Sequence, residues 1–320
     1  MTGARRFLHA NLNTPDAAAA ARFYAEVFGL TEVMKTDAKP VDGALYGRPG
    51  IRTHSNAAFL YDDRGPRSVV GLELQEWYRP KVGGEPYEDV RTPGFQWLGL
   101  SVPSLSGVEE QVRELGGTVV GRRDGALIRG AERTLWVRDR DGVLLELVEE
   151  PTGAGSRRTD GEGHRVAPGR MLRTAVSVGD LDAALAFHGA LGFEQVAHER
   201  IDDASDVFPT AESGAGLDVY MVRLPDDPAF FALLLAWDRP PLGAAYDDPW
   251  NRGLYRCALA VDDVRAEHAR LRDAGVERID EPTVVAMEGT KVGDLTLCFV
   301  RDPGGVTWEL VERPRTAFTT

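Results

Sequence analysis

A long internal repeat constrains the fold of this chain more than any other feature. The stretch RDRDGVLLELVEE at residues 138–150 returns as RDPGGVTWELVER at residues 301–313. In both copies a tight turn leads into a strand with one acidic residue among apolar ones, Glu146 in the first and Glu309 in the second. A carboxylate in such a strand needs a partner or a metal ion, because burying an unpaired charge is costly. The repeat therefore predicts two related units, each with a polar group near its core.

One order of elements occurs four times along the chain. Residues 7–13 alternate between polar and apolar side chains, and a helix over residues 17–28 follows a cap at Thr14 and ends at a glycine. Further strands come next, and a second module begins at residues 96–102, with a helix that opens on a capping box of Ser106 and Glu109. The other two modules have helices near residues 180–191 and 262–274. We therefore predict an α+β fold of four tandem βαβββ modules.

Residues 151–169 have the composition of a linker, with five Gly, two Pro and almost no large apolar side chain. This segment divides the chain into residues 1–150 and residues 170–320. We expect the modules to pair in sequence order, the first with the second and the third with the fourth. Each pair would form one open-barrel-like domain.

Composition limits the classes of partner. The chain has 320 residues, of which 43% are hydrophobic, and a formal net charge of -13, which argues against nucleic acid and anionic membranes. A small-molecule ligand is the default, and a homodimer is a compatible assembly. No signal peptide and no apolar run of membrane-spanning length is present, so we expect a cytoplasmic protein. Cys257 and Cys298 lack any metal-binding spacing and are expected to be reduced core residues.

The four modules, with closing strands that carry a central Glu after a D-x-D-G turn, resemble the vicinal oxygen chelate superfamily. This group includes glyoxalases, bleomycin-resistance proteins and extradiol dioxygenases, and the resemblance covers nearly the whole chain apart from the linker. It implies a cleft in each module pair, with metal ligands on the first and last strands of both modules. The matching positions of the first pair are His9, Glu73 and Glu146, with Trp97 where a fourth ligand is usual.

The resemblance thus implies one divalent metal ion, Mn, Fe, Co, Ni or Zn, held by His9, Glu73 and Glu146. Either Glu73 or Glu146 would move a proton during catalysis. Four further residues share these strand faces and are candidates for substrate binding, namely Asn11, Gln75, Trp97 and Ser101.

In the second pair the matching positions are Arg173, Leu233, Arg256 and Glu309. Guanidinium groups cannot ligate a cation and would repel one, so this cleft is predicted to hold no metal. Three interpretations of Arg173, Arg256 and Glu309 are open: a structural ion pair, which we favour, an anion-binding cleft, or a catalytic group.

The implied function is a metal-dependent isomerase, epimerase or lyase. A metal that binds two adjacent oxygens of a hydroxy-ketone-like or quinone-like molecule would ease loss of a proton from the neighbouring carbon. The alternative is a non-catalytic protein that binds an antibiotic-like molecule, with Trp97 as a stacking wall. A third interpretation is an iron-dependent ring-cleaving dioxygenase.

Overall fold

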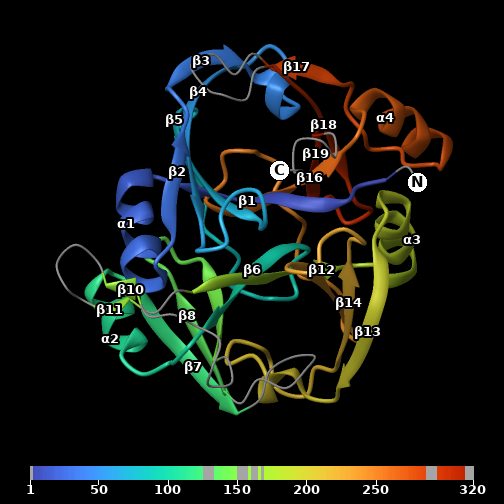
Figure 1. The fold of residues 1–320 in the computed structure, drawn as a ribbon. Helices are drawn as coiled ribbons and strands as arrows, with labels where there is room; N and C mark the ends of the chain where they lie inside the picture. The colour runs from blue at the N-terminus through green and yellow to red at the C-terminus, as the bar shows by residue number, and fades with distance from the viewer. Residues whose placement is uncertain are drawn as a thin grey trace.

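The structure is a computed structural model that describes residues 3–124, 133–149, 158–159, 165–166, 169–285 and 294–313. Within these residues the chain forms two large β-sheets, with helices packed around the outside (Figure 1). The predicted α+β class and the fourfold modular order are confirmed. None of the helices in these segments is long and apolar enough to span a membrane.

The elements follow the chain in four modules. The first module comprises β1 (Arg6–Thr14), α1 (Ala17–Phe28), β2 (Thr31–Lys35), β3 (Lys39–Asp42), the short 3-10 helix η1 (Gly43–Tyr46), β4 (Arg52–Tyr61) and β5 (Gly71–Arg79). The second comprises β6 (Gly94–Val102), α2 (Val108–Glu114), β7 (Thr118–Asp124), β8 (Arg133–Arg138) and β9 (Leu144–Glu149), and is followed by the small pair β10 (Arg158–Thr159) and β11 (Arg165–Val166). The third comprises β12 (Arg170–Val178), α3 (Leu181–Leu191), β13 (Glu194–Ile201), the 3-10 helix η2 (Ala204–Asp206), β14 (Leu217–Arg223) and β15 (Phe231–Trp237). The fourth comprises β16 (Gly253–Val261), α4 (Val264–Asp273), β17 (Thr283–Val285), β18 (Leu295–Arg301) and β19 (Thr307–Glu312).

Two helix starts differ from the sequence prediction. The cap of α1 is Asp16, whose side chain accepts a hydrogen bond from a backbone N–H of the first turn, and not Thr14. The cap of α2 is Gly107, without a side-chain hydrogen bond, so the predicted box of Ser106 and Glu109 is wrong. The Glu109 carboxylate forms an ion pair with β7 instead.

The modules do not pair in sequence order, and this prediction is wrong. The first and fourth modules share one sheet, in the order β17-β18-β19-β16-β1-β5-β4-β2, which we call the β1/β16 sheet. The second and third share the other, in the order β13-β14-β15-β12-β6-β9-β8-β7, which we call the β6/β12 sheet. In each sheet the first strands of two modules lie antiparallel at the centre, β1 beside β16 and β6 beside β12.

The two sheets share one hydrophobic core. The rings of Phe95 on β6 and Trp308 on β19 lie 5.0 Å apart, in an apolar cluster that contains residues of all four modules. Two buried carboxylates join the modules in a reciprocal way, because Asp227 accepts from the backbone N–H of Phe7 and Asp62 accepts from that of Met171. The core therefore does not divide at the predicted linker, most of which lies outside the described residues.

The two cysteines belong to the interior. Cys257 and Cys298 are free and buried, as predicted. Burial raises the pKa of both thiols, to about 12 for Cys298, so neither is a reactive thiolate.

Candidate functional site

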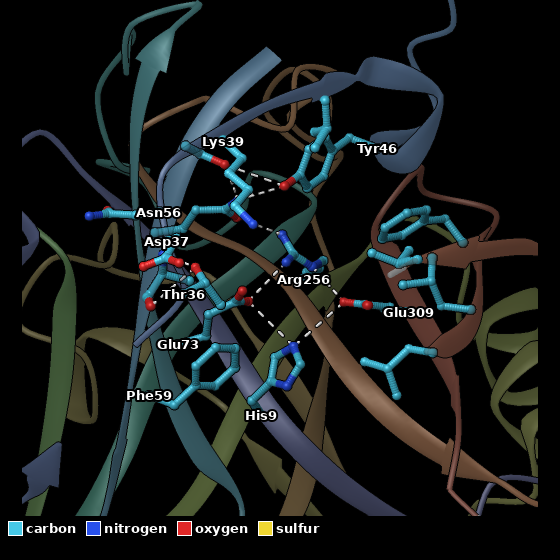
Figure 2. A pocket seen from close by; sticks show the side chains of 18 residues that line it. His9, Thr36, Asp37, Lys39, Tyr46, Asn56, Phe59, Glu73, Arg256 and Glu309 are labelled. Carbon is cyan, nitrogen blue, oxygen red and sulfur yellow. Dashed lines mark hydrogen bonds and ion pairs between the residues drawn. The ribbon is translucent and has the colours of Figure 1, made fainter. Parts of the chain in front are cut away.

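Four polar side chains from the four central strands of the β1/β16 sheet meet on one face. His9 lies on β1, Glu73 on β5, Arg256 on β16 and Glu309 on β19, and these strands are neighbours in the order β5-β1-β16-β19. The register sets Asn11 of β1 opposite both Glu73 and Arg256. Figure 2 shows the four side chains pointing toward one another. We call His9, Glu73, Arg256 and Glu309 the charged quartet.

The arginine is at the centre of this quartet. Arg256 donates from Nε to Glu309 Oε2 at 2.7 Å and from Nη2 to Glu73 Oε2 at 2.9 Å. His9 Nε2 faces the same two oxygen atoms, at 3.3 Å from Glu73 and 3.5 Å from Glu309. This nitrogen is buried and has no hydrogen-bond partner among the described residues. The imidazole is therefore held beside two carboxylates with its Nε2 available for a proton.

A neutral network fixes the quartet from the side. Asn11 donates to Glu73 Oε2 at 3.0 Å and to Gln75 Oε1 at 3.2 Å, and Arg256 Nη1 also donates to Gln75 Oε1 at 3.2 Å. The amide of Gln75 in turn donates to the hydroxyls of Tyr46 and Ser55 at 3.3 and 3.1 Å. Since the guanidinium and Glu73 are bonded both to each other and to these amides, they are held in one position.

Electrostatics separate Glu309 and Arg256 from ordinary surface groups. Burial alone would raise the pKa of Glu309, but the charge of Arg256 and the nearby His9 outweigh it and lower that pKa to about 2. Burial likewise opposes the charge of Arg256, while Glu73 and Glu309 raise the pKa of its guanidinium above the usual range. Two carboxylates and one guanidinium leave one net negative charge while His9 is neutral, and none when His9 is protonated.

The charged quartet forms the floor of a cavity of about 210 Å³. One wall comes from the first module and is largely polar, with Thr36, Asp37, Lys39, Tyr46, Ser55 and Asn56. The opposite wall comes from the fourth module and is apolar, with Val285, Leu295, Leu297 and Phe299. A ligand in this cavity would meet charged groups at the bottom, hydrogen-bonding groups on one side and a hydrophobic surface on the other.

The other repeat glutamate is in a different environment. Glu146 on β9 accepts from Arg173 Nε at 2.8 Å and from Arg173 Nη2 at 2.5 Å, and Trp97 Nε1 donates to it at 3.2 Å. The side chains of Arg173 and Glu146 are only 2% and 1% exposed. Leu233, at the remaining equivalent position, is buried in the apolar cluster above this pair.

Aromatic side chains fill the space over that pair. The rings of Trp97, Trp136 and Phe208 lie 5.0 to 5.3 Å from one another. Phe208 belongs to the segment after η2, and it is fully buried. The second cleft is therefore a packed core, and neither Glu146 nor Trp97 lines the cavity of the β1/β16 sheet.

The structure brings only part of the predicted site together. His9 and Glu73 meet, with Asn11 beside them and Gln75 in the cavity wall. Glu146, Trp97 and Ser101 lie in the β6/β12 sheet, so the set His9, Glu73 and Glu146 does not form one site.

Arg256 and Glu309 are the site residues that the sequence interpretation assigned to the wrong cleft. Both had been placed at the correct strand positions, and only the pairing of modules misplaced them. The predicted ion pair between them exists, but Arg173 pairs with Glu146 instead of joining them.

The implied metal ion does not fit this arrangement. The donor types of His9, Glu73 and Glu309 suit a divalent ion, and ligands at roughly 2.1 Å from a metal lie about 3 to 3.5 Å apart. His9 Nε2 lies 3.3 Å from Glu73 and 3.5 Å from Glu309, which fits that spacing. Both facing oxygens, however, already accept from Arg256, whose positive charge would lie beside the ion. Within the described segments, no group of three or more His, Cys, Asp or Glu side chains is arranged to hold a metal.

Comparisons with known proteins agree with the fold. A lactoylglutathione lyase of Arabidopsis thaliana is 29% identical over 185 residues, which is 58% of this chain and 53% of that protein. The chain thus spans about half the length of the curated relatives it matches. The crystal structure of glyoxalase I from Zea mays superposes with a TM-score of 0.63 at 17% identity, over 96% of this chain and 92% of the maize chain.

A family profile covers most of the sequence. Residues 6–147 and 170–310 each match the Glyoxalase/Bleomycin resistance protein/Dioxygenase superfamily. Together these segments contain nearly all of the four modules and every residue of the charged quartet. The chain belongs to the Glyoxalase/Bleomycin resistance protein/Dioxygenase superfamily.

Proposed function

We propose that this chain is an enzyme of the lyase or isomerase type, which moves a proton on a small molecule bound in the cavity of the β1/β16 sheet. The proposal rests on one observation. The first and last strands of the first and fourth modules each place one residue of the charged quartet on the cavity floor. Buried groups with strongly shifted pKa values in a cavity are a frequent mark of catalytic sites. The name of the Arabidopsis relative, a lactoylglutathione lyase, supports the same reaction class.

The walls favour a molecule with two neighbouring oxygens at one end and a less polar body. The oxygens would face the floor, where Arg256 can donate hydrogen bonds. The body would pack on the apolar wall around Leu297 and Phe299. A hydroxy-ketone-like or quinone-like metabolite has this distribution of polarity.

The carboxylates and the imidazole have different roles in the proposed proton transfer. Glu309, with a pKa near 2, is a weak proton acceptor and acts as a fixed negative charge. His9 is the better candidate to take the proton from carbon, since it lines the cavity and its Nε2 comes no closer than 3.3 Å to either carboxylate. Glu73 is the second candidate, and positioned proton transfer of this kind is worth roughly 10²–10⁴ in rate.

The sequestering alternative loses its main support. It rested on Trp97 as a stacking wall for an aromatic ligand. Trp97 is fully buried against Trp136 and Phe208 in the other sheet, and its indole N–H is bonded to Glu146.

Deuterium exchange tests the proposal without knowledge of the final product. Small hydroxy-ketones and dicarbonyl compounds would be incubated with the protein in D₂O, with and without added divalent metals, and followed by proton NMR. Wild-type protein should catalyse exchange at the carbon next to the oxygens, and His9→Gln should slow it by roughly 100-fold. His198→Gln is the matched control, because His198 is an exposed histidine paired with Asp218 on the outer strands β13 and β14. Tight binding without exchange would support the sequestering function instead, and equal exchange in His9→Gln would remove His9 from the mechanism.

A further inference from the structure

We propose that Arg256 occupies the place of a metal ion in this cleft, so that its guanidinium supplies the positive charge for the reaction. The catalytic part of this inference rests on the proposed function, whereas its metal-binding part stands on geometry alone. The chemical class of ligand is a molecule with two adjacent oxygens, one of them a carbonyl.

The contacts of Arg256 are those of a cation shared between two strands from different modules. Its Nε and Nη2 bind the carboxylates of Glu309 and Glu73, and its Nη1 binds the amide oxygen of Gln75. The guanidinium therefore joins β5, β16 and β19 through the same oxygen atoms that an ion between them would use. His9 Nε2 faces those two oxygens as well. Arg256 and His9 therefore already surround the place that an ion between the two carboxylates would take.

The charges also favour the guanidinium over a metal. Glu73 and Glu309 carry two negative charges, and Arg256 neutralises one of them. A divalent ion in the same place would leave an excess of positive charge in a buried site next to an arginine that cannot lose its proton. The lowered pKa of Glu309 is the expected response of a carboxylate to such a resident cation.

The guanidinium retains donors for a ligand. The three bonds above engage one N–H on each nitrogen, so Nη1 and Nη2 each keep a second N–H that can donate to a ligand oxygen. Arg256 lines the cavity, whereas Arg173, which binds the single carboxylate of Glu146 through Nε and Nη2, is sealed beneath Trp97. Only one of the two equivalent arginines can therefore meet a substrate.

The reaction balances without a further reagent. The C–H bond next to the carbonyl breaks, its proton moves to His9 Nε2, and its electron pair passes to the carbonyl oxygen held by Arg256. The hydroxyl proton then moves from the second oxygen of the enediolate to the first. His9 returns its proton to the former carbonyl carbon as the electron pair of the second oxygen forms the new carbonyl, which gives the isomer. No electron is gained or lost overall, so no oxidant or reductant is needed.

Substitution of the arginine by a metal ligand gives a direct test. Arg256→His would place a second imidazole beside His9, Glu73 and Glu309, and this set of two nitrogens and two carboxylates suits Co²⁺ or Zn²⁺. Purified proteins would be incubated with Co²⁺, dialysed and measured by elemental analysis and by visible absorption of bound cobalt. Wild type should retain little cobalt, and Arg256→His should retain about one ion per chain.

Arg173→His is the matched control, because the equivalent cluster of Glu146, Trp97 and Leu233 offers only one other ligand. It should bind no more cobalt than wild type. If Arg256→His does not fold, Arg256→Gln removes the charge while keeping an amide, and it should bind cobalt more tightly than wild type. The proposal fails if wild type holds one tightly bound ion per chain, or if both folded Arg256 variants bind no better than wild type.

Exchange measurements separate this inference from the proposed function. With a chelator present, wild type should keep its full deuterium exchange, and Arg256→Gln should lose roughly 100-fold. Exchange that stops with the chelator and returns with metal would overturn the role of Arg256. Absence of exchange in every sample, with the cobalt results as expected, would refute the proposed function and leave the metal-excluding role of Arg256 standing.

Discussion

Replacement of Glu146 by Gln should destabilise the protein strongly and leave the cavity unchanged. Glu146 accepts two charged hydrogen bonds from Arg173, at 2.8 and 2.5 Å, and a third from Trp97. Both charged side chains are almost completely buried in an apolar cluster. The substitution removes the negative charge and keeps the shape, so the guanidinium stays buried without a carboxylate. Loss of one partner of such a pair costs about 3–5 kcal/mol.

A double variant separates the cost of one unpaired charge from the net contribution of the ion pair to stability. The double variant Glu146→Met/Arg173→Met removes both charges and keeps similar volumes beside Trp97 and Phe208. Because a buried ion pair is often no more stabilising than well-packed apolar residues, the double variant should recover most of the loss. Its free energy of unfolding should lie within about 1.5 kcal/mol of wild type.

Urea denaturation at neutral pH, followed by tryptophan fluorescence and circular dichroism, gives the three free energies. Cobalt binding and deuterium exchange of the ligand report whether the cavity is affected. Neither should change in a variant that folds. A loss below about 1 kcal/mol in Glu146→Gln would show that the pair is not buried as described. A double variant as unstable as the single one would refute the assignment of the loss to an unpaired charge.

Three other outcomes are expected. Burial, with Asp141 as the next cause, raises the pKa of Asp139 to about 7, so the stability that its protonated form contributes is lost as pH rises through 7. Asp139→Asn can keep the bond to Tyr24, and in urea titrations its free energy of unfolding should gain up to about 4 kcal/mol relative to wild type between pH 4 and pH 8. Glu309 should show the opposite pH dependence, because its lowered pKa contributes stability that is full above about pH 4.5 and is lost as pH falls to 2. In Glu309→Gln the free energy of unfolding should therefore fall by about 3 kcal/mol less than in wild type over that window, and an equal fall in the two proteins would disprove this. Trypsin should cut first within residues 151–169, and the two fragments should elute together in gel filtration, because both large sheets take strands from each side of the cut; separate elution would contradict the sheet pairing.

The sequence was sufficient for the modules and insufficient for their partners. The apolar and polar alternation of residues 7–13 and the repeat around Glu146 and Glu309 predict β1, β9 and β19 as found. The partner of each module was inferred from sequence proximity, since neighbouring elements usually pack together. That rule fails here because all four first strands offer similar edges, so local pattern does not distinguish one partner from another.

The balance of buried charges distinguishes the two possible pairings of the modules. Pairing in sequence order would have gathered Glu73 and Glu146 in one cleft without a cation, and Arg173 and Arg256 in the other with one carboxylate. The observed pairing instead gives each buried arginine a carboxylate from the opposite half of the chain, Glu146 for Arg173 and Glu73 for Arg256. Arg256 also binds Glu309 of its own half. Because an unpaired buried charge costs several kcal/mol, about the whole stability of a small domain, charge balance was a stronger guide than proximity.

The same glutamate in a repeated strand acquires two roles through its surroundings. Glu146 and Glu309 both bind a guanidinium from the first strand of a module, β12 and β16 respectively, so the ion pair itself does not make a site. The difference lies above the pair, where Trp97 and Phe208 fill the space over Glu146, while His9 leaves the space over Glu309 open to a cavity. A buried pair under aromatic rings can only stabilise the fold, whereas a buried pair beneath a cavity can also act on a ligand. Access, rather than the identity of the charged residues, therefore decides which of the two clefts can have chemistry.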